Sequence, residues 1–230
     1  MFERFRQRSY KPERLDTGEY TPDEYARWQG EMQLLHRFWG ELRALEHTLI
    51  RDIRNLRPGP LSILDIGAGT GDILKFVKAT LPDHDLFLVA GDLALDALDA
   101  VAAESPSSGI HPVECSGLSL PFDDDSFDYT ICTLLLHHLS DEDALALIRE
   151  MRRVSRLRFY VVDLNRHPVG YYCFKLISPF LFQPFLREDG ALSILRSFTP
   201  DEIMRLAGKA GISDVTVEHS RGNRLVLSGR

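Results

Sequence analysis

The sequence predicts an α/β protein in which helices cover both faces of a doubly wound, mostly parallel, Rossmann-like sheet of seven strands. The first observation behind this prediction is that apolar runs of strand length alternate with helical segments over residues 61–162. The second is a glycine-rich turn directly after the first run, and the third is a pair of apolar runs at the end of the chain. At 230 residues with 44% hydrophobic composition, the chain fits one large domain with an appended helical part.

The N-terminal part reads as helical from Tyr25 onward. Apolar residues recur there in steps of three and four until Leu45, which is typical of a helical stripe, and Gly40 is expected to divide it into two helices. Arg57-Pro58-Gly59-Pro60 then interrupts the helical pattern. We therefore divide the chain into an arm with a helical lid over residues 1–57 and a sheet domain over residues 58–230.

The sheet domain alternates strands with helices in chain order. Strands are expected at 61–66, 85–90, 110–115, 127–136 and 157–162, and helices at 72–81, 94–104 and 141–154. A helix follows over Pro200–Gly211, with Thr199 as its N-cap, and then an antiparallel hairpin with strands at 214–219 and 223–229. Between the fifth strand and that helix lies an insertion, residues 165–197, with six aromatic side chains between Tyr171 and Leu186.

Charge and cysteine content narrow the function classes. The net charge of −7 argues against a nucleic-acid-binding protein. The basic N-terminal arm is interrupted by Glu3 and Glu13, so we expect it to be solvated and mobile. The three cysteines are widely spaced and form no C-x-x-C pair, which predicts buried thiols in a reducing compartment. The first residues show no secretory signal, and we expect a cytoplasmic protein.

The glycine-rich turn is the sequence LDIGAGTGD, Leu64 to Asp72. Its spacing is G-x-G-x-G, whereas dinucleotide folds usually carry G-x-G-x-x-G. Asp65 and Asp72 flank the turn, and their charges disfavour a phosphate beside it. The turn therefore suits a ligand with some positive charge and no phosphate, although Asp72 is equally well explained as a helix-capping residue. Asp92, after the second strand, could accept hydrogen bonds from the ribose hydroxyls of any adenosine cofactor.

Three ordered motifs, LDIGAGTGD, GDLALDAL and SLPFDDDSFDYTICTLLLHHLSD, resemble the class I S-adenosylmethionine-dependent methyltransferases. The likeness covers about residues 61–162 and is greatest to the ubiquinone/menaquinone methyltransferase-like branch that acts on small molecules. LDTGEYTPDEYARWQGEMQLLHRFWG and LSILRSFTPDEI are more loosely similar to methyltransferases associated with type III polyketide synthases. The resemblance implies S-adenosyl-L-methionine as cofactor and methyl transfer to oxygen or carbon of a phenolic, polyketide or quinol-like acceptor in secondary metabolism.

The same resemblance implies roles for single residues. Asp65 and the turn would face the methionine end of the cofactor, Asp92 the ribose and Leu93 the adenine. The family often has an aspartate for the adenine amino group where this chain has Ser116, so Ser116 or the backbone of Gly117 and Leu118 would supply that contact. The cofactor-binding residues expected on this basis are Asp65, Gly67, Ala68, Gly69, Gly71, Asp92, Leu93, Ser116, Gly117 and Leu118.

His137 and His138 are the candidate catalytic residues. They end the expected fourth strand, and an imidazole can take a proton from a phenol or another hydroxyl. Neighbouring residues of a strand point to opposite faces, so we expect only one of them to face a ligand. Alternatively, one packs under the next helix and the other lines the pocket without chemistry. The sequence offers too few convergent ligands for a metal site, and none is expected.

The insertion is the expected acceptor side. Asp163, Arg166, Tyr171 and Phe174 are the candidate substrate-binding residues, while Arg166 could equally pair with a surface acid. Prolines and Lys175 make the insertion a poor membrane span. It is expected either to form an apolar pocket for an aromatic or lipidic acceptor, with shallow contact with a membrane surface, or to bury its aromatics in the core or in a homodimer interface. The sequence does not decide between these two interpretations of the insertion. It also does not decide whether the protein is a monomer or a homodimer.

The N-terminal helices are expected to close over the cofactor through Trp28, Arg37, Phe38 and Trp39. Two other functions remain as alternatives. One is an NAD-dependent oxidoreductase, and the other is a non-catalytic scaffold that keeps the cofactor pocket.

Overall fold

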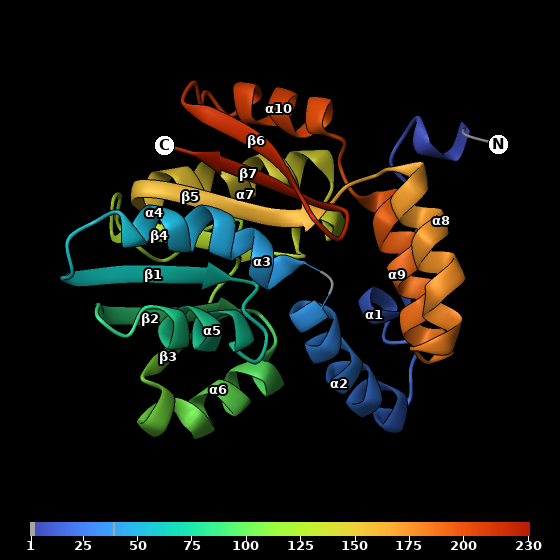
Figure 1. The fold of residues 1–230 in the computed structure, drawn as a ribbon, viewed down its shortest axis with the longest axis horizontal. Helices are drawn as coiled ribbons and strands as arrows, with labels where there is room; N and C mark the ends of the chain where they lie inside the picture. Colours follow the sequence, from blue (N-terminus) through green and yellow to red (C-terminus); the bar gives the residue numbers. More distant parts are fainter. Residues whose placement is uncertain (1–2, 39) are drawn as a thin grey trace.

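The computed structural model describes residues 3–38 and 40–230 of the chain. Trp39 lies outside the described residues, and the side chains of Arg37 and Phe38 are not described, so their expected part in the lid stays a prediction. The centre of the molecule is one sheet of seven strands in the order β3-β2-β1-β4-β5-β7-β6 (Figure 1). The strands are β1 (Pro60–Ile66), β2 (Asp85–Asp92), β3 (Ile110–Glu114), β4 (Phe127–Thr133), β5 (Ser155–Leu164), β6 (Val215–Ser220) and β7 (Arg224–Gly229).

The sheet has the topology expected for this fold. β1 to β5 run parallel to their neighbours, and β7 lies antiparallel between β5 and β6. The strand order reverses between β1 and β4, and in doubly wound sheets ligands bind beyond the carboxyl ends of the strands at this point. The fold class and the terminal antiparallel hairpin are confirmed.

Helices on both faces of the sheet build two hydrophobic cores. Ile63 points into a core shared with the helices of residues 41–54 and 72–80, whereas its neighbour Leu64 points into a core shared with the helices of residues 141–154 and 200–209. This alternation follows from the two-residue period of a strand. The helices concerned are α3 (Glu41–Leu45), the π-helix η2 (Glu46–Ile50), α4 (Arg51–Arg54), α5 (Asp72–Thr80), α6 (Leu95–Ser108), α7 (Asp141–Val154) and α10 (Pro200–Lys209). Thr199 caps α10 in a capping box with Glu202, as its sequence predicts.

The remaining helices form a separate layer beyond the carboxyl ends of the strands (Figure 1). They are η1 (Glu3–Phe5), α1 (Arg14–Thr17), α2 (Pro22–Phe38), α8 (Pro168–Ile177), η4 (Ser178–Phe180) and α9 (Pro184–Arg196). A third apolar cluster joins the N-terminal part, through Phe5 and Leu35, to the insertion, through Phe174 and Leu186. Thus two segments far apart in the sequence together cover the edge of the sheet where the site is expected.

The N-terminal arm differs from the sequence prediction because it is docked on the molecule. The Arg8 side chain is buried, and its guanidinium donates to the backbone carbonyls of Arg196 at 2.6 Å and Leu139 at 3.0 Å and pairs with Asp141 at 2.5 Å. It also lies over the Phe198 ring, 3.7 Å from the ring centre. Carbonyls at the ends of several elements thus satisfy a charge that we expected to be solvated.

Two smaller expectations were also wrong. Cys115 and Cys132 are buried thiols, but Cys173 is exposed. The fourth strand ends at Thr133, and the chain then turns into the short 3-10 helix η3 (Leu136–His138). Leu134, between them, has a positive φ of 52°, and such backbone strain in a non-glycine residue is typical of functional sites.

Candidate functional site

The glycine turn after β1 forms the floor of one half of the site. Gly67, Gly69 and Gly71 all have positive φ, a conformation that glycine adopts without a steric cost. The N–H of Gly69 donates to Asp92 Oδ2 at 2.8 Å, which ties the turn to the end of β2. Asp72 accepts from the Thr70 hydroxyl at 3.0 Å and is the first residue of α5, where a negative charge interacts favourably with the helix dipole.

Asp65 provides a buried acid at the same place. Its side chain is fully buried, and neither carboxylate oxygen has a hydrogen-bond partner among the described residues. Burial, with a smaller contribution from Asp92, raises the pKa of Asp65 well above its usual range. An unpartnered buried acid is costly, and a ligand that carries an ammonium group would remove that cost. The methionine end of S-adenosylmethionine carries such a group, so this observation fits the cofactor.

Asp92 and the loop after β3 lie where the other half of the cofactor site is expected. Each Asp92 oxygen accepts one backbone N–H, from Gly69 at 2.8 Å and Ala94 at 2.9 Å, and each keeps a lone pair for a ribose hydroxyl. Leu93 is 65% exposed, and Leu118 follows the neighbouring strand and is also exposed. These leucines offer apolar surface to an adenine ring.

Gly117 lets the loop after β3 approach the end of β1. A Cβ at this position would lie 2.8 Å from Ile66 Cγ2 and 2.9 Å from Leu147 Cδ1. The Ser116 hydroxyl accepts from the Leu118 N–H at 3.2 Å. The residues expected to bind the cofactor therefore lie at the ends of three adjacent strands, β1, β2 and β3.

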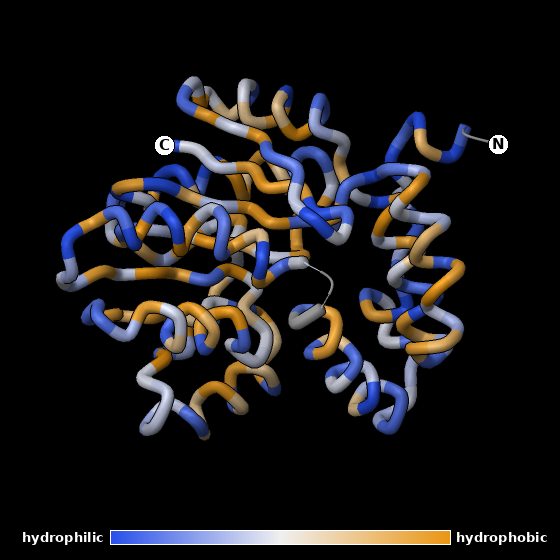
Figure 2. Tube along the Cα trace, in the orientation of Figure 1, coloured by the Kyte–Doolittle hydropathy of each residue, from blue (hydrophilic) through white to orange (hydrophobic). Residues whose placement is uncertain are grey.

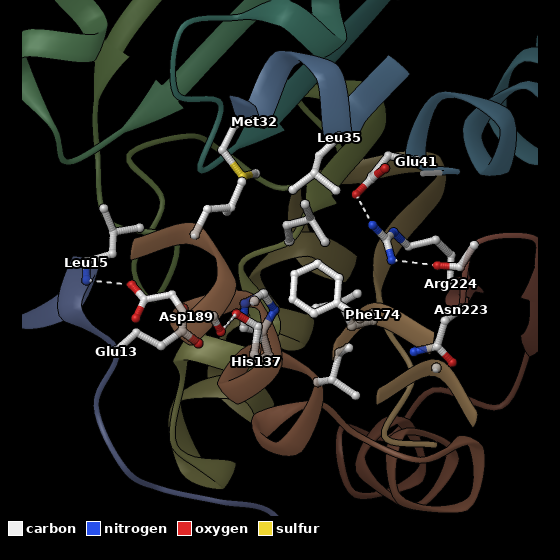
Figure 3. A pocket seen from close by; sticks show the side chains of 18 of the residues that line it. Glu13, Leu15, Met32, Leu35, Glu41, His137, Phe174, Asp189, Asn223 and Arg224 are labelled. Carbon is white, nitrogen blue, oxygen red and sulfur yellow. Dashed lines mark hydrogen bonds and ion pairs between the residues drawn. The ribbon is translucent and has the colours of Figure 1, made fainter. Parts of the chain in front are cut away.

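A cavity lies between the helical layer and the ends of β4 and β5 (Figure 3). Its volume is about 140 Å³, close to the roughly 150 Å³ of an engineered cavity that binds benzene. Most of its wall is apolar, and these lining residues are Leu15, Trp28, Met32, Leu35, Leu134, Leu164, Phe174, Leu186 and Ile194. The polar lining residues are Glu13, Glu41, His137, His138, Asp189, Ser193, Asn223 and Arg224. A flat ring with polar substituents matches this lining.

His137 and Asp163 form a buried pair at the cavity. His137 Nδ1 lies 2.6 Å from Asp163 Oδ1, and Asp163 also accepts the backbone N–H groups of His137 at 2.9 Å and Leu164 at 2.6 Å. Burial alone would raise the pKa of Asp163, but attraction to His137 and these hydrogen bonds outweigh burial and lower it. An ionised Asp163 can only accept, so Nδ1 of His137 carries a proton, and in the neutral form of the ring Nε2 is the proton acceptor.

His138 faces the same cavity, which corrects the expectation that the two histidines point apart. Their ring centres are 4.3 Å apart, because both residues lie in η3 and not in an extended strand. His138 Nδ1 lies 2.8 Å from Asp16 Oδ1, and Asp16 is also bound by Arg196. The hydrogen bonds from these groups and from the backbone outweigh burial and lower the pKa of Asp16.

Glu13 joins the two histidines from the N-terminal arm. Glu13, His137 and His138 each place one ligand-type atom within 4.8 Å of the others. This convergence is closer than the sequence suggested, although a structural zinc site needs four donors. Glu13 Oε1 is buried without a hydrogen-bond partner among the described residues, and Arg196 Nε lies 3.7 Å from it. Burial, opposed by His138 and Arg196, raises the pKa of Glu13 to about 7.

Replacing Glu13 by glutamine is expected to change how stability depends on pH. Folded Glu13 keeps its proton up to about pH 7, whereas the unfolded chain releases it near the ordinary carboxyl value, so wild-type stability falls as the pH rises between these values. Glutamine does not titrate. The unfolding free energy of the variant minus that of the wild type should therefore increase by about 3 kcal/mol from pH 4.5 to pH 8. Urea denaturation at both pH values measures it. The exposed Glu218→Gln is the control, and an equal response in both variants contradicts the expectation.

The candidate substrate residues separate in the structure. Phe174 lines the cavity, and Asp163 is engaged by His137.

Arg166 is not among the cavity-lining residues, because its buried guanidinium donates to the carbonyls of Phe5 at 3.0 Å and Ser197 at 2.7 Å and pairs with Glu202. Tyr171 packs against Phe5 and lines a groove on the other side of α8. The contacts of Arg166 match the alternative that it pairs with an acid. The acid is Glu202, and the guanidinium is buried against the N-terminal arm instead of lying at the surface.

A buried ion pair at the far end of the cavity had no signal in the sequence. Arg224, at the start of β7, pairs with Glu41, at the start of α3, and both side chains are buried. Glu41 Oε2 and Arg224 Nε have no hydrogen-bond partner among the described residues. The pair joins residues 183 positions apart, so only the fold reveals it.

Comparisons with known proteins agree with this geometry. A family model described as "Methyltransferase domain" matches residues 63–157. The chain is 33% identical over 166 residues to the demethylmenaquinone methyltransferase of Roseiflexus castenholzii, covering 66% of this chain and 68% of that protein. It is 30% identical over 176 residues to the ubiquinone/menaquinone biosynthesis C-methyltransferase UbiE of Xanthomonas axonopodis pv. citri, covering 69% and 68%. The structure of a SAM-dependent methyltransferase from Aquifex aeolicus superposes with a TM-score of 0.62 at 14% identity, covering 87% of this chain and 96% of that one.

The chain belongs to the class I S-adenosylmethionine-dependent methyltransferases. It is a methyltransferase enzyme, and its cofactor is S-adenosylmethionine. These findings replace the alternatives of an NAD-dependent oxidoreductase and a non-catalytic scaffold.

Proposed function

We propose that the enzyme transfers a methyl group to oxygen or carbon of a small aromatic acceptor, phenolic, polyketide or quinol-like, held in the cavity between the helical layer and β4–β5. The observation that carries the proposal is a benzene-sized apolar cavity with a proton-accepting imidazole at one edge. The names of the quinone-pathway relatives support an aromatic acceptor. A role in secondary metabolism and a cytoplasmic location belong to the same proposal.

The cofactor site is proposed to work in three parts. Asp65 and the backbone of Gly67, Ala68, Gly69 and Gly71 hold the methionine end, and Asp92 holds the ribose. Leu93, Ser116, Gly117 and Leu118 contact the adenine. When bound, S-adenosylmethionine supplies an electrophilic methyl group on a sulfonium. The chain's task is then to align the acceptor, exclude water and remove a proton.

His137 is proposed to take the acceptor proton at Nε2. Asp163 keeps the imidazole in the required tautomer and stabilises the imidazolium that forms. His138 and Glu13 offer further hydrogen-bonding atoms at the same edge, oriented by Asp16 and Arg196. Because deprotonation raises electron density on a phenol's oxygen and ring carbons alike, this arrangement serves either methylation site.

Residues 1–57 and the insertion 165–197 are proposed to act together as the cover of the site. Trp28 from α2 and Phe174 from α8 both line the same cavity. Burial, Tyr20 and the carboxylates of Asp96 and Asp92 raise the pKa of Tyr25, so α2 lies within electrostatic reach of the ribose-binding aspartate. The cover is proposed to reach over both the acceptor cavity and the cofactor residues.

An assay of methyl transfer to a panel of single-ring phenols and quinols tests the proposal. We expect turnover of at least one of these acceptors. Phe174→Ala should raise the KM for that acceptor about tenfold, because the acceptor ring loses an aromatic contact and apolar burial. Phe87→Ala removes an exposed ring on β2 and should leave KM unchanged. Cofactor binding without turnover of any aromatic acceptor contradicts the proposal. The NMR chemical shift of the transferred methyl group distinguishes oxygen from carbon methylation, because the two products have the same mass.

A further inference from the structure

The outer side of the insertion carries a patch of exposed apolar side chains, which we call the α8–η4 face. It consists of Val169, Leu176, Ile177, Phe180 and Leu181. Leu176 is 72% exposed and Phe180 is 84% exposed, the largest exposed fraction among the large hydrophobic residues described. Figure 2 shows α8 as a mostly hydrophobic segment at the edge of the molecule. Contiguous exposed apolar surface of this kind marks an interaction site.

The face lies directly outside the acceptor cavity. Phe174 points from α8 into the cavity, whereas Leu176 and Phe180 point to solvent. The helix is therefore apolar on both sides, although only its inner side is covered by the described part of the chain. No helix among the described residues has the length and apolar character needed to cross a bilayer. A membrane contact by a segment this short would be confined to the bilayer interface.

Cations gather next to the α8–η4 face. Between residues 168 and 186 the only charged side chain is Lys175, and Arg187 follows directly. Lys11, Lys175 and Arg187 line one groove between α1, α8 and α9, with a volume of about 820 Å³. None of the three takes part in an ion pair with the described residues. On a protein of net charge −7, unpaired cations beside an apolar face are a local exception.

The acids of this groove are mostly engaged elsewhere. Glu188 pairs with Arg14 at 3.9 Å, and Glu13 is buried toward the cavity. Asp189 accepts the backbone N–H groups of Arg14 and Leu15, each at 3.0 Å. Glu19 also lines the groove and is exposed without an ion pair to the described residues, so three unpaired cations, Lys11, Lys175 and Arg187, face one unpaired acid. The groove therefore keeps an excess of unpaired positive charge beside the α8–η4 face.

We propose that the α8–η4 face docks on the surface of an anionic lipid bilayer, with Phe180 and Leu176 inserted at the acyl boundary and Lys175, Lys11 and Arg187 contacting the headgroups. A second copy of the chain is the weaker partner, because a two-fold contact would set the cations of each copy near those of the other. An anionic bilayer satisfies the apolar face and the cations together. This inference does not depend on the identity of the acceptor.

Flotation of the full chain with vesicles tests the proposal without any methyl-transfer assay. Vesicles of phosphatidylglycerol and phosphatidylcholine should bind the protein, and pure phosphatidylcholine vesicles should bind it at least tenfold less. Phe180→Ser should weaken binding to the anionic vesicles about tenfold, because an inserted ring is lost. Lys175→Gln should weaken binding to the anionic vesicles about fivefold. The difference between this variant and the wild type should disappear at high salt, which screens the charge.

Matched controls keep the test decisive. Met204→Ser removes an exposed apolar side chain on α10 and should leave flotation unchanged. Circular dichroism and S-adenosylhomocysteine binding confirm that each variant is folded. The proposal is wrong if the wild type does not float with anionic vesicles, or if Phe180→Ser floats like the wild type. It is also wrong if analytical ultracentrifugation shows a dimer that Phe180→Ser converts to a monomer, because the face is then a self-interface.

Discussion

His137→Ala is expected to lower kcat by about 10²–10⁴ at neutral pH, while the affinity for S-adenosylhomocysteine changes little. His137 Nε2 is proposed to take the acceptor's proton, and Asp163 holds Nδ1 at 2.6 Å, so alanine removes the base and leaves the glycine turn untouched. The measurement is kcat and KM with the best acceptor of the phenol and quinol panel, together with isothermal titration of S-adenosylhomocysteine.

Two further variants separate a base from a structural histidine. Asp163→Asn should also reduce kcat strongly, because an amide can donate to Nδ1 and turn the ring to the wrong tautomer. His138→Ala should have a smaller effect, since its Nδ1 partner Asp16 is held mainly by Arg196. A kcat of His137→Ala within threefold of the wild type would rule out His137 as the base.

Asp92→Ala is expected to weaken S-adenosylhomocysteine binding by about 10²–10⁴. Hydrogen bonds to a charged group contribute about 1.5–3 kcal/mol each, and Asp92 is proposed to accept two from the ribose. The carboxylate also accepts the N–H groups of Gly69 and Ala94, so its loss loosens the turn that faces the methionine end. Isothermal titration measures the change.

Asp96→Ala is the matched control for this experiment, because Asp96 is exposed four residues later in the first turn of α6. It should bind S-adenosylhomocysteine like the wild type. If Asp92→Ala also binds like the wild type, the proposed ribose contact is wrong.

The expected cofactor residues could be named in advance because their positions follow from local rules. An apolar strand, a turn that only glycine allows, and an acid after the next strand are readable within about 30 residues, and parallel strands bring such ends to one edge of the sheet. Asp163 and His137 are candidates because each lies at the end of an expected strand. Their hydrogen bond was not foreseen, because it depends on where β4 stops and η3 begins.

Glu13 and Arg8 show the limit of local reasoning. Both belong to an arm whose composition is typical of a solvated segment, yet both are buried against residues more than 120 positions away. Their burial depends on carbonyls and charges that exist at that place only after the sheet and the insertion have folded. Arg166 is held in the same way, since its buried guanidinium donates to the carbonyls of Phe5, from the N-terminal arm, and Ser197, from the end of the insertion.

The strand–turn–helix order, the glycine turn and the family of the enzyme can be read directly from the residues, because strand period, glycine stereochemistry and helix capping act over a few neighbours. The acceptor cavity cannot be read from the residues in this way. Its walls come from α2, α8 and the ends of β4 and β5, and its polar edge joins Glu13 to His137 and His138. Side-chain packing between distant segments creates that geometry, and no local pattern of residues encodes it.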